Sequence, residues 1–351
     1  MNQVFARYDR QLILPDFGLE AQEKLRSAHV LVVGAGGLGC PVLQYLAAAG
    51  IGRISLADGD VVSLSNLHRQ VLYTEQDIGR SKALVAGERL RLLNSEVSIT
   101  VYQEQWSLRH CLEKLNDVDL VIDCSDNFPT RYLLDDACRL FHIPLVFGAV
   151  SRYEGQLAVF APGQVHYRDI FRNPPKAGEI QDCGGAGVVG MLPGIIGSMQ
   201  AMEALKWLTG IGEPLANKLL TYNALQQQVY TLELTRGPEA GPQTLEEFVG
   251  WTYEDACTME NFEVSEFPDG YEVVDVRGLE EQPRLKRAHR SIPLAELPGF
   301  LEDLKHKRII FVCQHGQRSR QAVQLFNEYY PSALVFSLKG GIQQYQKKED
   351  V

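Results

Sequence analysis

A glycine-rich turn between an apolar run and a helical stretch constrains the fold more than any other feature. Residues 30–33 read Val-Leu-Val-Val, which predicts a buried parallel strand, and Gly34-Ala-Gly-Gly-Leu-Gly39 follows at once. Pro41–Ala49 predicts a helix, because proline is favoured in the first helical turn. A second predicted strand, residues 53–57, ends at Asp58. The order strand, glycine turn, helix, strand and acid therefore predicts a parallel α/β sheet.

This pattern has a chemical interpretation and a structural one. Glycines let the backbone approach a phosphate, the helix start offers free N–H groups, and an acid about 20 residues on binds a ribose. A glycine turn can also serve close packing alone. If a nucleotide binds, a nicotinamide or flavin dinucleotide is the usual ligand of this fingerprint. We predict a nucleotide site on a Rossmann-like, mostly parallel sheet with helices on both faces.

The segment after Asp58 disfavours a dinucleotide and favours phosphate chemistry. It is a long polar loop that contains Asn66 and Arg69, and a helix predicted over residues 81–93 has Lys82 in its first turn. A cation destabilises a helix N-terminus, so Lys82 requires either a nearby anion or a solvent-exposed stem. A phosphate would supply that anion.

Carboxylates also follow another predicted strand, residues 118–122, which runs into Asp123-Cys-Ser-Asp-Asn127. Because parallel strands end at one edge of a sheet, we expect Asp126 to lie close to Asp58. Asp126 is alternatively a cap for the helix predicted at residues 130–141.

Two further candidates lie outside this edge of the sheet. Arg10 belongs to the N-terminal run Arg7–Gln11, and it either faces solvent or reaches a neighbouring chain. Cys183 lies in a long loop without periodicity, residues 167–187, and loops of that length are usually functional or mobile.

Composition narrows the class of protein. A chain of 351 residues with a net charge of −10 is not a general nucleic-acid binder. It has no apolar N-terminal run after a basic start and no stretch of 18 apolar residues, so we expect a cytoplasmic protein without a signal peptide or membrane segment. Its seven cysteines include no Cys-x-x-Cys pair, which gives neither a disulfide framework nor a thiolate zinc motif.

The C-terminal part predicts a second, small α/β domain with a nucleophile. A Gly/Pro-rich, acidic stretch suggests domains at residues 1–240 and 259–351, joined by a linker at 241–258. A strand at residues 308–312 runs into Cys313-Gln-His-Gly-Gln-Arg-Ser319, and a helix follows. Loop N–H groups and the helix start can cradle an anion and stabilise a thiolate, so we predict that Cys313 is functional rather than a buried apolar residue.

With these residues in place, the chain resembles two known families. Residues 1–235 resemble the adenylyltransferases that activate ubiquitin-like sulfur carriers, which include the molybdopterin-synthase and thiamine-pathway types and are related to ubiquitin-activating enzymes. Residues from about 260 onward resemble a rhodanese domain. The matching segments are Arg7–Gln11, Gly34–Gly39, Asp58–Gln70, Lys82, Asp123–Arg131, Cys183–Gly187, Gly197–Lys206, Asp275–Arg277, Cys313–Ser319 and Leu338–Ile342.

The first resemblance implies roles for most of the candidates. It implies that ATP is held by Gly36, Gly37 and Asp58, with Asp58 on the ribose. It implies phosphate contacts from Asn66, Arg69 and Lys82, and a role for Asp126, beside Asn127, in binding Mg²⁺ or positioning the α-phosphate. Arg10 matches an arginine that enters the partner subunit's site, which implies a homodimer.

Together the two resemblances imply an adenylyltransferase and sulfurtransferase. ATP would adenylate the C-terminal Gly-Gly carboxylate of a small ubiquitin-like sulfur-carrier protein, and a persulfide on Cys313 would convert the adenylate to a thiocarboxylate. A persulfide donor such as a cysteine desulfurase would load Cys313. Cys183 matches a mobile-loop cysteine that forms a covalent intermediate in some relatives and is dispensable in others.

Two departures from the families qualify the resemblance. The first family often holds zinc with two Cys-x-x-Cys pairs, but here the corresponding places read His166-Tyr-Arg-Asp169 and residues 236–243, without cysteine. We predict no structural zinc, and expect hydrophobic or polar contacts in its place. The usual rhodanese His-Ile-Pro-Gly-Ala run is replaced by Arg287–Pro293.

Two alternative functions remain open from the sequence. One is a dinucleotide-dependent oxidoreductase with a regulatory rhodanese domain, which the phosphate-directed cations disfavour. The other is a non-catalytic scaffold that docks the carrier.

Overall fold

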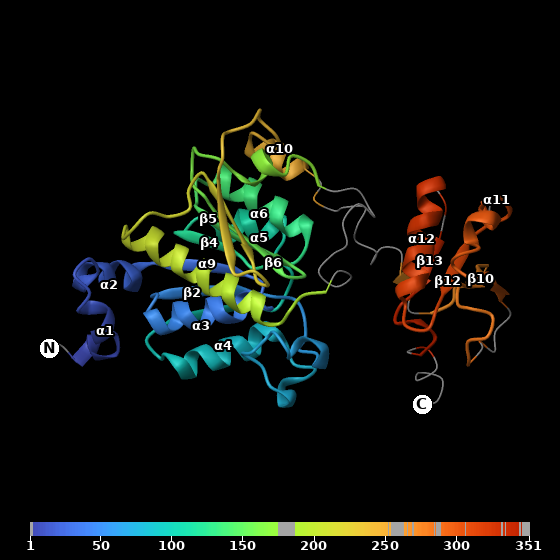
Figure 1. The fold of residues 1–351 in the computed structure, drawn as a ribbon, viewed down its shortest axis with the longest axis horizontal. Helices are drawn as coiled ribbons and strands as arrows, with labels where there is room; N and C mark the ends of the chain where they lie inside the picture. Colours follow the sequence, from blue (N-terminus) through green and yellow to red (C-terminus); the bar gives the residue numbers. More distant parts are fainter. Residues whose placement is uncertain are drawn as a thin grey trace. The chain divides into compact units, whose positions relative to one another are not determined.

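The computed structural model describes residues 3–174, 187–251, 253, 263–264, 266–268, 270–283, 285, 289–305, 307–330, 333, 335–343 and 345. The chain divides into two compact units, one comprising the described residues up to Tyr253 and the other those from Glu263 onward (Figure 1). Within these ranges no helix has both the length and the apolar character that crossing a bilayer requires.

The first unit is built on an eight-stranded sheet in the order β3-β2-β1-β4-β5-β6-β7-β8. Strands β1 to β5 pair in parallel, and β6, β7 and β8 continue the sheet in antiparallel pairs. Their bounds are β1 His29–Val33, β2 Arg53–Ala57, β3 Ser98–Tyr102, β4 Leu120–Asp123, β5 Leu145–Ser151, β6 Glu154–Phe160, β7 Lys218–Asn223 and β8 Gln228–Glu233. The mostly parallel sheet predicted from the sequence is confirmed.

Helices cover both faces of this sheet, as predicted. Helices α2, α3, α4 and α9 lie on one face, and α5, α6 and α10 on the other (Figure 1). Alternate residues of β1 serve the two faces, since Val30 and Val32 belong to the core under the first group and Leu31 and Val33 to the core under the second. The helices are η1 Gln3–Tyr8, α1 Asp9–Leu12, α2 Gly18–Ser27, α3 Gly39–Ala49, η2 Leu64–Asn66, η3 Glu75–Asp77, α4 Lys82–Leu93, α5 Leu108–Lys114, α6 Phe128–Leu140, α7 Tyr167–Ile170, α9 Met191–Thr209 and α10 Leu245–Gly250.

Helix α10 lies within the segment for which the sequence suggests a linker. Thr244 caps it by accepting a hydrogen bond from the Glu247 N–H at 3.1 Å, and Phe248 is fully buried in the core of the first unit. The Tyr253 hydroxyl donates to Asp136 of α6 at 2.8 Å. Folded structure of the first unit therefore continues as far as Tyr253.

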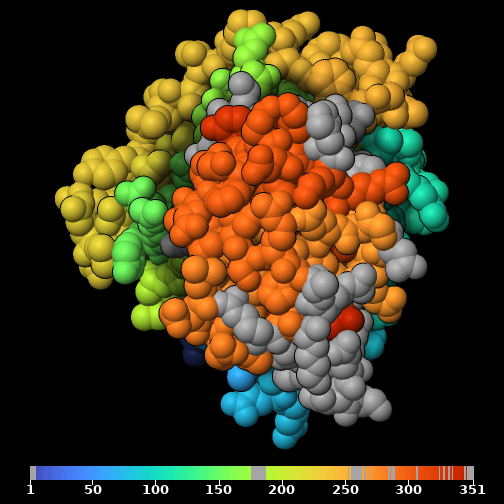
Figure 2. All heavy atoms as spheres, turned by 90° about the vertical axis from the view of Figure 1, so that its right-hand side faces the viewer, coloured from blue at the N-terminus to red at the C-terminus, as the bar shows by residue number. Residues whose placement is uncertain are grey.

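The second unit has its own sheet, a five-stranded one in which every pair is parallel, in the order β11-β10-β12-β13-β9. Alternation again fills two cores, since Val274 packs on one face and Val273 on the other. The described atoms of this unit are orange and red in Figure 2. Its elements are β9 Glu263–Val264, β10 Glu272–Asp275, β11 Arg290–Ser291, η5 Leu297–Phe300, α11 Leu301–Leu304, β12 Ile309–Val312, α12 Gln317–Tyr329 and β13 Val335–Leu338.

Candidate functional site

A pocket of about 220 Å³ opens where the winding of the first sheet changes direction. Strand β1 has β2 on one side and β4 on the other, and the carboxyl ends of such neighbouring strands are where open α/β sheets bind ligands. The pocket brings together most of the residues predicted for the nucleotide site. These are Gly36, Gly37, Asp58, Arg69, Lys82, Asp126 and Asn127.

The glycines of the turn divide between packing and the pocket. Gly34 has φ +99°, and a Cβ there would lie 2.5 Å from the Cys124 carbonyl oxygen, while a Cβ on Gly39 would collide with the Gly34 carbonyl. These two positions let β1, β4 and α3 approach closely. Gly36 and Gly37 line the pocket instead. The packing interpretation and the binding interpretation thus apply to different glycines of one turn.

Asp58 ends β2 and is fixed against the glycine turn. Its Oδ2 accepts a hydrogen bond from the Ala35 N–H at 2.7 Å, and its Oδ1 accepts one from the Asp60 N–H at 2.8 Å. Burial raises the pKa of Asp58, and the nearby Lys82 ammonium opposes that shift.

Lys82 is buried at the start of α4, with only 5% of its surface exposed. Its Nζ forms an ion pair with Asp60 Oδ2 at 2.9 Å. The interpretation that Lys82 keeps its side chain in solvent is therefore wrong. In the structure, the anion beside Lys82 is the Asp60 carboxylate. Arg69, on the same pocket wall, donates to the Ser65 carbonyl at 3.1 Å and contacts His68 Nε2 at 2.8 Å.

The residues after β4 were predicted either to line the nucleotide site or to cap the next helix, and the structure gives these roles to different residues. Asn127, not Asp126, caps α6, since its side chain accepts a hydrogen bond from the Thr130 N–H at 2.9 Å. Asp126 as the helix cap is therefore wrong, and Asp126 is an exposed residue on the pocket wall. The described residues contain no group of three or more His, Cys, Asp or Glu side chains suited to a metal ion.

Two residues predicted for the adenylation step do not line this pocket, and a third is not described. Asn66, at the end of η2, is not among the residues that line it, and Arg10 is exposed on α1 and does not line it either. Cys183 lies outside the described residues.

The pocket also contains polar groups to which the sequence gave no role. Within the described residues, Gln70 Oε1, Asp123 Oδ2 and Arg131 Nε are buried atoms without a hydrogen-bond partner, and Gln70 and Arg131 line the pocket. Burial also raises the pKa of Asp123. All three residues belong to segments that carry the family resemblance, so that resemblance was the signal that could have found them.

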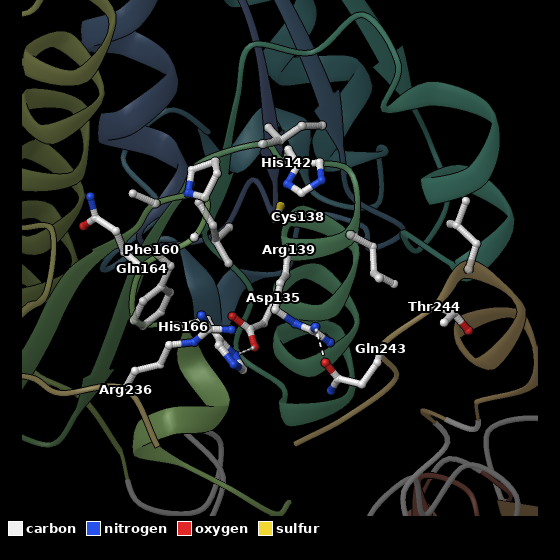
Figure 3. A pocket seen from close by; sticks show the side chains of 17 residues that line it. Asp135, Cys138, Arg139, His142, Phe160, Gln164, His166, Arg236, Gln243 and Thr244 are labelled. Carbon is white, nitrogen blue, oxygen red and sulfur yellow. Dashed lines mark hydrogen bonds and ion pairs between the residues drawn. The ribbon is translucent and has the colours of Figure 1, made fainter. Parts of the chain in front are cut away.

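A second cavity, of about 390 Å³, lies beside the C-terminal half of α6 (Figure 3). His166, Arg236 and Gln243 also line it. These residues belong to the two segments, 166–169 and 236–243, where the resembling family often has zinc-binding cysteines. Asp135 points to His166 at one side of this cavity, with 3.0 Å between Oδ2 and Nδ1, and also accepts the Tyr167 N–H at 2.8 Å (Figure 3).

Polar contacts join the segments around this second cavity. Arg168 donates two hydrogen bonds to the buried Asp136 carboxylate, at 2.8 and 2.7 Å, and Tyr253 donates a third. Asp169 accepts the Gly237 N–H at 2.9 Å. We call Asp135, Asp136, His166, Arg168 and Tyr253 the α6 anchor. It ties residues 166–169 and 253 to one helix.

Cys313 lies in the second unit, where β12 ends and the loop to α12 begins. It is buried, and its Sγ is 3.4 Å from Ser319 Oγ, which in turn lies 2.8 Å from Ser337 Oγ. Gly341, with φ +66°, is needed beside the loop because a Cβ there would collide with the Cys313 carbonyl. The thiol is thus held in a strand–loop–helix unit, as predicted from the sequence.

Each arginine of this region that the structure describes has a carboxylate partner. Arg277 pairs with Asp275, both completely buried, and also donates to Gln314 Oε1 of the cysteine loop at 2.8 Å. Arg318, in the first turn of α12, forms a two-pronged pair with Glu281 at 2.5 and 2.8 Å. Arg320 lies 3.8 Å from Glu263. Sequence reasoning missed Glu281, which belongs to no motif.

Comparison with known proteins gives consistent matches for both units. Residues 8–241 match the ThiF family, and residues 263–348 match the rhodanese-like domain. The chain is 52% identical over 238 residues to the sulfur carrier protein adenylyltransferase of Thermus thermophilus, covering 66% of this chain and 88% of that protein.

Two longer relatives match along nearly the whole chain. The adenylyltransferase and sulfurtransferase MOCS3-1 of Zea mays is 36% identical, covering 98% of this chain and 82% of that protein. The MOCS3 protein of Xenopus laevis is also 36% identical, covering 99% and 88%. In fold, the chain is similar to E. coli MccB crystallised with ATP, at 23% identity and a TM-score of 0.53, over 63% of this chain and 67% of that one.

Proposed function

The chain belongs to the ThiF family and carries a rhodanese-like domain, and we propose that its two units perform consecutive steps of one reaction. It is an adenylyltransferase and sulfurtransferase. It uses ATP to activate a small sulfur-carrier protein and then transfers sulfur to it. The observation that carries this conclusion is that both units lie in one chain that matches two-activity relatives over 98% and 99% of its length.

For the first step, the pocket at the end of β1 and β4 is the proposed ATP site. Gly36 and Gly37 would let the backbone approach the phosphates, and Asp58 would accept hydrogen bonds from the ribose. The position of Asp58 supports this, because Ala35 holds its carboxylate beside the glycine turn. Asn127 would lie at the rim of the same site.

Cations are needed where the α-phosphate is attacked. The carrier's C-terminal Gly-Gly carboxylate forms a bond to the α-phosphorus, and the bond to pyrophosphate breaks with its electron pair leaving on pyrophosphate. Arg69 and Lys82, both on the pocket wall, would stabilise the charge that spreads over the phosphate oxygens, with Asn66 as a further donor. Lys82 would then exchange its contact with Asp60 for one with phosphate.

Mg²⁺ is a proposed companion of ATP here, with Asp126 as its protein ligand. Magnesium is usually bound through one or two carboxylates together with substrate phosphates. Asp126 is an exposed carboxylate on the pocket wall, and the described residues hold no three-residue metal cluster, which fits that mode. The ion would neutralise phosphate charge.

For the second step, Cys313 would carry a persulfide. Its terminal sulfur forms a bond to the carrier's acyl carbon, and the bond to AMP breaks with its electron pair leaving on AMP, which gives an acyl disulfide. A second thiolate then forms a bond to Cys313 Sγ, and the S–S bond breaks with its electron pair leaving on the carrier's sulfur. The products are the carrier thiocarboxylate and a disulfide between Cys313 and that second thiol. A second protein with a persulfide, such as a cysteine desulfurase, would load Cys313. Cys183 is proposed either as a covalent relay between the steps or as a bystander.

Arg10 is proposed to act across a homodimer. It is exposed on α1 and does not line the pocket of its own chain, so a role in catalysis would require a second copy. A cytoplasmic location is proposed with it, from the composition.

Carrier-dependent exchange of labelled pyrophosphate into ATP tests this function directly. The probes are small proteins that end in Gly-Gly, drawn from the genome of the source organism. Exchange with one of them establishes adenylation and identifies the carrier. Nicotinamide binding without exchange would favour an oxidoreductase, and carrier binding without ATP turnover would favour a docking scaffold.

A further inference from the structure

The cysteine loop of the second unit is surrounded by arginines, yet it carries no excess positive charge from them. In the described part of this region, Arg277, Arg318 and Arg320 pair with Asp275, Glu281 and Glu263, so three guanidinium groups face three carboxylates. Anion binding by such a loop then depends on backbone N–H groups and on the start of α12.

Glu281 is the carboxylate that matters most for incoming substrate. Asp275 and its partner are completely buried, whereas Glu281 and Arg318 are 39% and 38% exposed, so this pair faces solvent at the loop that contains Cys313. Each terminal nitrogen of Arg318 donates a hydrogen bond to one carboxylate oxygen of Glu281. The guanidinium therefore binds a carboxylate of the protein rather than a free anion.

The backbone holds Glu281 in this position. The Gly278 N–H donates to Glu281 Oε1 at 2.9 Å, and the neighbouring Arg277 donates to Gln314 of the cysteine loop. The segment after β10 therefore contacts the cysteine loop at Gln314 and the start of α12 at Arg318. These contacts hold the pKa of Glu281 down to about 2, mainly through Arg318, so the carboxylate is charged at neutral pH.

We propose that Glu281 determines which sulfur donor Cys313 accepts. By neutralising Arg318, it disfavours a compact dianion such as thiosulfate and leaves the site to donors whose transferred sulfur is a persulfide with a single negative charge. The inference rests on the proposed role of Cys313 as the sulfur carrier of the second unit.

The chemistry at sulfur is the same with either donor. The Cys313 thiolate forms a bond to the outer sulfur of the donor, and the donor's own bond to that sulfur breaks with its electron pair leaving on the remaining group. That group is sulfite from thiosulfate and a thiolate from a persulfide, and Cys313 becomes a persulfide in both cases. The donors differ in charge at the loop, which is the quantity that Glu281 controls.

Steady-state sulfur transfer to cyanide, measured with the full-length protein, tests the proposal. Thiosulfate and cysteine persulfide serve as the two donors. We expect Glu281→Gln to lower the KM for thiosulfate about fivefold or more while kcat changes little, the size expected when one half-exposed charge no longer opposes a dianion. The KM for cysteine persulfide should change less than twofold.

Two further variants test whether the change in KM comes from charge beside the cysteine loop or from the loss of any acidic side chain. Glu302→Gln on α11 removes the same charge from an acid that contacts Lys305 and Tyr330, and it should leave both KM values unchanged. Arg318→Gln leaves the Glu281 carboxylate unopposed and should raise the KM for thiosulfate. If Glu281→Gln fails to fold, Arg318→Gln still decides the matter, because an unchanged or lower KM for thiosulfate contradicts the proposal.

The outcomes distinguish this inference from the function on which it rests. If thiosulfate KM is unchanged in Glu281→Gln, or if both donors shift together, Glu281 does not select the donor. If the wild-type protein takes sulfur from neither donor onto Cys313, as read by its intact mass, the proposed sulfur-carrying role itself is wrong.

Discussion

The two candidate sites share a backbone plan but differ in how firmly carboxylates hold their cations. Each lies where a parallel strand runs through a loop into a helix, at β1–α3 in one unit and at β12–α12 in the other. In the first, buried Lys82 and Arg69 both line an open pocket. In the second, Arg318 at the start of α12 forms a two-pronged contact with Glu281.

This difference fits the charge of the proposed substrates. A triphosphate needs cations that can move from a protein partner to a phosphate, and the Lys82 contact is with Asp60, whose side chain is 59% exposed. A persulfide with a single charge needs a nucleophile and N–H groups, so surplus cations would only recruit other anions. The same strand–loop–helix unit can thus serve two chemistries, depending on which carboxylates pair with the cations beside it.

The largest expected effect is a loss of sulfur transfer without any loss of adenylation. Cys313→Ser should reduce sulfur transfer by about 10³-fold or more, because the hydroxyl of serine cannot carry a persulfide. Pyrophosphate exchange in the same variant should stay at the wild-type rate. Loss of exchange in Cys313→Ser would mean that the two sites are not chemically independent.

The converse change should affect only the first site. Lys82→Met should lower pyrophosphate exchange about 10²-fold, because a cation at the α-phosphate is lost, while Cys313 still accepts sulfur from cysteine persulfide. The stranded Asp60 is mostly exposed, so the fold should tolerate the change. Lys114→Met, an exposed lysine on α5, is the matched control, and equal losses in both variants would contradict the role of Lys82.

The α6 anchor offers a third contrast, since it stabilises only the first unit. Asp136→Asn should cost about 3 kcal/mol of unfolding free energy, because it leaves the buried Arg168 without its counter-ion. Tyr253→Phe should cost about 1 kcal/mol, the value of one hydrogen bond. Urea unfolding followed by tryptophan fluorescence measures both, because Trp106, Trp207 and Trp251 all lie in the first unit.

Glu113→Gln is the control for the anchor, since its pair with Arg109 is exposed and should be worth well under 1 kcal/mol. If Asp136→Asn and Glu113→Gln lower the free energy of unfolding equally, the α6 anchor does not stabilise the first unit.

The smallest expected effect concerns acid stability of the second unit. Because the folded protein lowers the pKa of Glu281 from 4.5 to about 2, its stabilising contribution is full above about pH 4.5 and is lost as pH falls toward 2. Glu281→Gln should weaken this pH dependence slightly. Hydrogen exchange of α12, compared between the two proteins at each pH, measures it, and a parallel pH dependence in both would contradict the shift.

The sequence predicted those parts of the sites in which adjacent residues carry the signal. The glycine turn, Asp58 and the cysteine loop each follow a predicted strand within a few consecutive residues. The same short segment therefore indicates both the backbone geometry and the chemistry. Glu281 could not be found this way, because its partner lies 37 residues further along the chain.

The same limit explains what else was missed. Arg168 and Tyr253 meet Asp136 from 32 and 117 residues away, and no periodicity links them. Lys82 shows the complementary limit. The sequence left open a nearby anion or a solvent-exposed stem, and only the fold shows that Lys82 is buried beside Asp60.

The α6 anchor has a consequence for how this protein can change over generations. Asp136 accepts hydrogen bonds from Arg168 and Tyr253 inside a buried site, so replacing either Asp136 or Arg168 leaves the other as an unpaired buried charge. Neutral drift at these positions is therefore blocked one substitution at a time, although a joint replacement by apolar residues of similar volume is physically acceptable. In descendants of this chain, Asp136 and Arg168 should be inherited or exchanged as a pair.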